Sequence, residues 1–61
     1  MKISIFIVDD EPLIVEGLLA TIGSLGLPVN VVGYAYSGEL ALEEIKQKRP
    51  QILLCDIRMR K

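Results

Sequence analysis

Short, almost uninterrupted apolar runs alternate along this chain with two segments whose apolar residues recur at helical spacing. Residues 3–8 lack the polar–apolar alternation of a half-exposed strand, so they predict a strand that is buried on both faces. Residues 30–34 and 51–57 predict two further short strands. The order strand, helix, strand, helix, strand predicts an α/β fold in which helices cover a parallel sheet.

Residues that favour helix ends bound both helical segments. The first helix is expected over residues 12–25, because Pro12 suits the first turn and Gly26 follows the last apolar position. Ser37 is expected to cap the second helix, and Pro50 stops it. The apolar positions expected to face the sheet are Leu13, Ile14, Gly17, Leu18, Thr21, Ile22 and Leu25 in the first helix, and Leu40, Ala41 and Ile45 in the second.

The connections between parallel strands restrict the strand order, because they are almost always right-handed. If the second and third strands flank the first, the helices cover opposite faces and bury both sides of residues 3–8. We therefore predict the order 2-1-3. This order leaves an apolar edge at residues 52–55, which is typical of an interior strand and is an aggregation hazard when open. We expect the 61 residues to be a truncated domain that ends within its sheet.

Length and composition exclude several functions. The 61 residues form at most one small domain, and a net charge of −1 gives no case for nucleic-acid binding. One cysteine permits no internal disulfide, and the absence of histidine excludes Ser-His and Cys-His catalysis within the chain. Cys55 lies in an apolar run and is expected to be a buried structural thiol. No stretch resembles a signal peptide or a membrane span, so we expect a cytoplasmic protein without a membrane partner.

Acidic residues follow the first and third predicted strands. Asp9 and Asp10 come directly after the first strand, and Asp56 closes the third. In the order 2-1-3 these strand ends lie roughly 5 Å apart, at the carboxyl edge where open α/β folds bind ligands. No Lys or Arg between residues 3 and 45 can neutralise converging carboxylates, so they indicate a hard divalent cation, Mg²⁺. Alternatively, Asp9, Asp10 and Glu11 could simply form a turn and begin a helix.

Three blocks of this sequence resemble the receiver domains of bacterial two-component response regulators. They are residues 7–12 (IVDDEP), residues 37–42 (SGELAL) and residues 50–59 (PQILLCDIRM). The resemblance implies the N-terminal βαβαβ half of a flavodoxin-like doubly wound sheet. Residues 10–14, 17–18 and 56–59 are most similar to receivers that are joined to AraC-type DNA-binding domains.

The resemblance also implies a role for each acidic residue. Asp56 matches the aspartate that accepts a phosphoryl group, and Asp10 and Asp56 match the side chains that ligate Mg²⁺. Asp9 matches an acid that acts through water, and the Arg58 carbonyl matches a further metal ligand. The phosphoryl donor would be a phosphohistidine of a sensor histidine kinase. The chain would not itself be an enzyme, and it would act on DNA only through an output domain outside these 61 residues.

Some features depart from the family. Arg60 stands where family members place proline. The Ser or Thr and the Lys that later strands supply have no counterpart here, so the chain alone is expected to bind metal weakly at best and not to switch. It could instead act as a truncated fragment that forms a homodimer through the open third strand.

Two other α/β functions fit poorly. A nucleotide or flavin site needs glycines where residues 9–12 read DDEP. A phosphatase with an aspartate nucleophile wants two aspartates separated by one residue, whereas Asp9 and Asp10 are adjacent.

Overall fold

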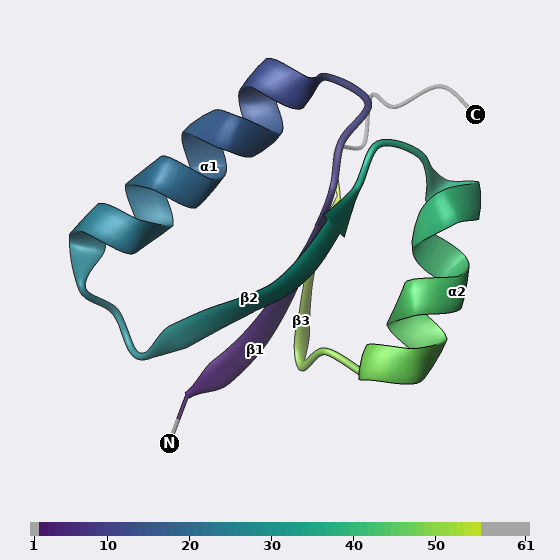
Figure 1. Ribbon diagram of the computed structural model, residues 1–61. Helices are drawn as coiled ribbons and strands as arrows, with labels where there is room; N and C mark the ends of the chain where they lie inside the picture. Colours follow the sequence, from purple (N-terminus) through teal and green to yellow (C-terminus); the bar gives the residue numbers. More distant parts are fainter. Residues whose placement is uncertain (1, 56–61) are drawn as a thin grey trace.

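The structure is a computed structural model that describes residues 2–55. Two helices lie on opposite faces of a three-stranded sheet (Figure 1). The elements are β1 (Ile3–Val8), α1 (Pro12–Leu25), β2 (Val29–Ala35), α2 (Gly38–Lys48) and β3 (Ile52–Cys55). The predicted elements are confirmed, although β2 is one residue longer at each end and β3 begins at Ile52 instead of Gln51. The last two positions of the predicted third strand lie outside the described residues.

The sheet is parallel and has the order β2-β1-β3, which confirms the predicted topology. β3 pairs with β1 in an unbroken register from Ile5–Ile52 to Val8–Cys55. The β1–β2 register shifts once, between Ile5 and Phe6, and Val32 is the extra residue of β2 at this bulge. β1 is therefore the central strand, and its carboxyl end lies between the ends of its two neighbours.

Two small apolar clusters form the core, one on each face of β1. On the α2 face, Phe6 and Val8 pack with Ala41 of the helix. Leu40 was also expected to face the sheet, but it is 66% exposed. On the α1 face, Ile5 and Ile7 pack with Val15. Side chains of β1 are thus buried toward both helices, as the almost uninterrupted apolar run predicted.

The buried face of α1 differs from the predicted one. Leu13 and Leu25 were expected to face the sheet, but they are 80% and 60% exposed. The side chains that pack on the sheet are Val15, Leu18, Leu19 and Ile22. Most of the circumference of α1 is apolar, so the spacing of its apolar residues fits two overlapping stripes. Only packing against β1 selects which stripe is buried.

The prediction of a buried thiol at Cys55 is wrong. Cys55 is a free, exposed cysteine, and its neighbours Ile52, Leu53 and Leu54 are 39–49% exposed. Within residues 2–55, β3 pairs only with β1, so one edge of β3 has no strand beside it. Neither helix in the described part of the chain is long and apolar enough to cross a membrane.

Candidate functional site

The carboxyl ends of the strands carry the candidate site. Val8 pairs with Ala35 on one side and with Cys55 on the other, so the three strands end at the same level. The Asp9 backbone N–H donates to the Ala35 carbonyl oxygen at 3.1 Å, which places Asp9 beside the end of β2. Asp56 follows Cys55 in sequence, but Asp56 and Arg58 both lie outside the described residues.

Among residues 2–55, Asp9 is the buried acid of this edge. Its side chain is only 5% exposed, and it belongs to no core cluster. Its Oδ1 accepts a hydrogen bond of 2.9 Å from the Glu11 backbone N–H. Asp9 therefore makes the local turn contact that was considered as an alternative to metal binding, and it does so with one oxygen. No donor among residues 2–55 reaches its Oδ2.

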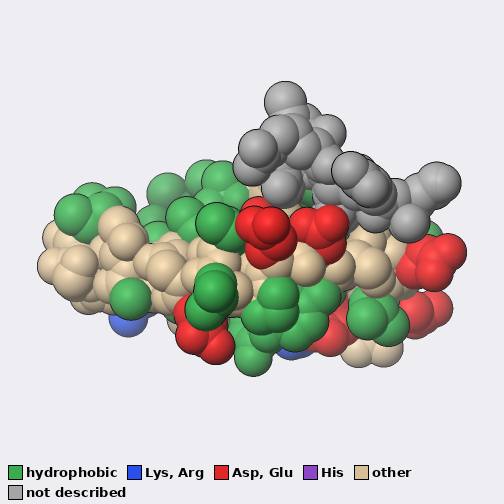
Figure 2. Space-filling model, turned by 90° about the horizontal axis from the view of Figure 1, so that it is seen from above, with side chains coloured by type: hydrophobic (Ala, Val, Ile, Leu, Met, Phe, Trp, Pro, Cys, Tyr) green, Lys and Arg blue, Asp and Glu red, His purple; other side chains and the backbone are tan. Residues whose placement is uncertain are grey.

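Asp10 and Glu11 are exposed at the start of α1. Glu11 is the N-cap residue, and its carbonyl oxygen accepts from the Ile14 and Val15 backbone N–H groups at 3.0 and 3.2 Å. Its side chain makes no capping hydrogen bond, so the capping function considered for this carboxylate is not seen. Figure 2 views the molecule from the carboxyl ends of the strands and shows acidic side chains near the centre of this face, with others toward its edges.

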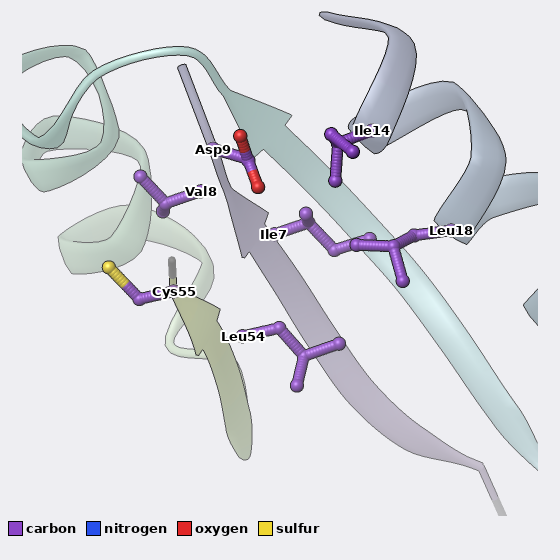
Figure 3. Close-up of a pocket in the computed structure, with 7 residues that line it drawn as sticks. All are labelled: Ile7, Val8, Asp9, Ile14, Leu18, Leu54 and Cys55. Atoms are coloured by element: carbon purple, nitrogen blue, oxygen red, sulfur yellow. The ribbon is translucent and has the colours of Figure 1, made fainter. Parts of the chain in front are cut away.

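A groove of about 280 Å³ opens beside Asp9 on the α1 face of the sheet. The residues that line it are Ile7, Val8, Asp9, Ile14, Leu18, Leu54 and Cys55. Figure 3 shows Ile7, Asp9 and Leu54 on the side of the sheet that faces α1, while Val8 and Cys55 point to the other side. The groove therefore has apolar walls with one buried carboxylate at its upper end.

The donor chemistry suits a hard cation, but the described residues do not complete a site. Within residues 2–55, no three Asp, Glu, His or Cys side chains lie close enough together to hold a metal ion. Asp9 and Asp10 provide two adjacent carboxylates, the ligand type that Mg²⁺ prefers. The described ion pair, Lys48–Glu44, lies at the far end of α2. A complete site therefore needs a ligand from outside the described part, as the prediction for Asp56 requires.

A tyrosine pair at the end of β2 was not singled out from the sequence. The Tyr34 and Tyr36 rings lie 5.7 Å apart, and both side chains are partly exposed. Partial burial, the Tyr34 hydroxyl and the Glu16 carboxylate raise the pKa of Tyr36. Tyr34 lies in β2 and Tyr36 directly follows its last residue. Residues two apart in an extended chain share a face, and that spacing could have indicated the pair.

Comparisons with known proteins agree with the fold. The family model described as response regulator receiver domain matches residues 5–61. The probable transcriptional regulatory protein NarL of Mycobacterium tuberculosis is 45% identical over 58 residues, which are 95% of this chain and 26% of that protein. The transcriptional regulatory protein LnrK of Bacillus subtilis is 40% identical over 57 residues, 93% of this chain and 26% of that protein. No solved structure matches.

The uncharacterized transcriptional regulatory protein YesN of Bacillus subtilis is 34% identical over 55 residues, 90% of this chain and 15% of that protein. The chain thus spans about a quarter or less of the length of these curated relatives.

Proposed function

The chain belongs to the response regulator receiver family, and on that premise we propose that Asp56 is the residue that accepts the phosphoryl group. One observation carries this assignment. Val8 and Cys55 are register partners, so the two strands that lead to Asp9 and to Asp56 end side by side. The carboxyl edge of an open parallel sheet is also where such folds bind their ligands.

The proposed chemistry is a nucleophilic attack by a carboxylate. An oxygen of Asp56 attacks phosphorus, the bond from phosphorus to the donor breaks, and an acyl phosphate forms. When bound, Mg²⁺ would neutralise charge on the transferring oxygens. Asp9 and Asp10 would hold the ion, together with Asp56 and the Arg58 carbonyl. The chain is then the acceptor of the group and not an enzyme that turns over substrate.

The proposed partners follow from family membership. The donor is a phosphohistidine of a sensor histidine kinase, and the regulated output is transcription through a DNA-binding domain. The relatives bear the names of transcriptional regulators, and this chain matches only a part of each. The narrower assignment, to receivers that are joined to AraC-type DNA-binding domains, stays a prediction.

A small-molecule donor tests the assignment without a cognate kinase. The chain is incubated with acetyl phosphate and Mg²⁺, and its intact mass is recorded beside that of Asp56→Asn. In parallel, the matching 58 residues of the mycobacterial relative are replaced by those of this chain. We expect weak labelling of the chain, stronger labelling of the chimera, and none in either Asp56→Asn variant. Equal labelling after Asp56→Asn, or no labelling of the chimera, would refute the assignment.

A second candidate function is self-association through β3. Leu53 and Leu54 are 49% and 39% exposed, and β3 carries no charged side chain. An edge of this kind can pair with the same edge of a second copy. Sedimentation at several protein concentrations tests the idea, with Leu53→Lys as the variant. A concentration-independent monomer would exclude the homodimer.

A further inference from the structure

Asp9 follows β1 and makes two hydrogen bonds, one from its backbone to the end of β2 and one through its side chain to the residue before α1. Its N–H donates to the Ala35 carbonyl oxygen, which fixes Asp9 to β2. Its Oδ1 accepts from the Glu11 N–H at 2.9 Å. Glu11 in turn accepts the first hydrogen bonds of α1 with its carbonyl oxygen. One buried carboxylate therefore lies between the sheet and the first helical turn.

No other described side chain makes a hydrogen bond at this end of the helix. Glu11 is the N-cap but makes no side-chain capping bond, and Pro12 has no N–H to offer. The bend at Asp10 consequently has the Asp9 carboxylate as its one side-chain hydrogen bond within residues 2–55. The Asp10 side chain is exposed and accepts no hydrogen bond from that part of the chain.

We propose that Asp9 is a positioning residue for Asp10, in addition to any contact that it makes with the cation. One oxygen, Oδ1, holds the turn and so fixes where Asp10 presents its carboxylate. The other oxygen, Oδ2, stays available to the cation or to a water molecule bound to it. This inference rests on the proposed function, because it assigns the two oxygens of Asp9 to different tasks in the same site.

Two substitutions separate these tasks. Asp9→Asn keeps an oxygen acceptor for the Glu11 N–H but removes the charge. Asp9→Ala removes both. Each variant is compared with the unchanged chain by amide hydrogen exchange of Glu11 without metal, and by Mg²⁺ titration. The amide of Ile7 in central β1 serves as the internal reference for global stability, because Asp9 is buried. Asp10→Ala is the matched control, since its side chain bears no described hydrogen bond.

We expect Asp9→Ala to lower the hydrogen-exchange protection of the Glu11 amide about fivefold relative to the Ile7 amide, because the Glu11 N–H loses its one described hydrogen bond. Asp9→Asn and Asp10→Ala should leave that protection unchanged. For Mg²⁺, Asp9→Asn should weaken binding about tenfold, and Asp9→Ala about tenfold more. Unchanged Glu11 protection in Asp9→Ala, or equal Mg²⁺ affinities of the two Asp9 variants, would overturn the positioning role. Absence of saturable Mg²⁺ binding in the chimera would instead count against the proposed function, whereas the exchange measurement needs no metal and tests the positioning role by itself.

Discussion

Val8 of β1 and Cys55 of β3 are register partners in a parallel pair. The residues that follow them in the sequence, Asp9 and Asp56, are the two acids on which the proposed phosphoryl transfer depends. A shift of one residue in this register would put the two strand ends at different levels and would also turn the β3 side chains to the other face. The parallel pairing of β1 with β3 therefore also aligns the proposed site.

The cap of α2 gives a first stability prediction. The Ser37 hydroxyl oxygen accepts a hydrogen bond of 3.2 Å from the Leu40 backbone N–H. Ser37→Ala should lower the free energy of unfolding by about 1 kcal/mol, because an N-terminal donor of the helix loses its partner. Urea denaturation followed by circular dichroism measures the change. Ser24→Ala is the control: the Ser24 hydroxyl is exposed and donates to the Thr21 carbonyl near the end of α1, so this variant should stay within about 0.5 kcal/mol.

Gly33 gives a second prediction. A Cβ at this position would lie 2.8 Å from Phe6 Cε2 and 2.9 Å from Lys48 Nζ. Phe6 is fully buried, so Gly33→Ala should destabilise the fold by about 1–3 kcal/mol. Gly23 lies within α1, and a Cβ there would meet nothing within 4 Å. Gly23→Ala should therefore stabilise the chain by about 0.5–1 kcal/mol, because alanine favours a helix. A melting temperature of Gly33→Ala that equals or exceeds that of the unchanged chain would contradict this account of Gly33.

Lys48 is predicted to stabilise the bulge in β2. Its Nζ donates to the Val32 carbonyl oxygen and to Glu44 Oε1, both at 2.9 Å. Lys48→Met should cost about 1 kcal/mol, mainly through the lost bond to the backbone. Glu44→Gln removes only the exposed ion pair and should cost about 0.3 kcal/mol. Chemical denaturation of both variants separates the two contacts, and equal losses would show that the ion pair matters more than the bulge.

The raised pKa of Tyr36 predicts that the free energy of unfolding declines at alkaline pH. Partial burial, Tyr34 and Glu16 raise the pKa of Tyr36, so the folded chain disfavours the phenolate. The resulting stabilisation is fully present below the unfolded pKa of about 10 and is lost as the pH rises through the folded pKa. Tyr36→Phe should flatten this decline in the free energy of unfolding. Glu16→Gln should lower the pKa of Tyr36 in an ultraviolet titration, and an unchanged pKa would exclude Glu16 as a cause.

The sequence predicted the strands, the helices and their order because these depend on local patterns. The almost uninterrupted apolar run of β1 requires cover on both faces, and right-handed connections then leave the order 2-1-3. Ser37 was correctly predicted as a cap, since that function needs only neighbouring backbone atoms. Gly26 was also correctly placed after α1, where its φ of 68° suits glycine.

The wrong predictions concern contacts between distant residues. Val15 and Leu19 were not assigned to the buried face of α1, because an almost wholly apolar helix does not show which stripe packs on the sheet. Cys55 was expected to be buried because its run is apolar, yet burial depends on what lies beside β3. The hydrogen bond from Glu11 to Asp9 was not specified either, although a turn role for Asp9 was considered.

The most direct test of the central claim is a titration of the chain with Mg²⁺ and beryllofluoride, a phosphoryl mimic, followed by amide chemical shifts. The account predicts saturable shifts at Asp9, Asp10, Asp56 and Arg58, and their loss in Asp56→Ala. It would be contradicted by shifts that are spread over exposed carboxylates of α2 such as Glu39 and Glu43, or by shifts that persist unchanged in Asp56→Ala.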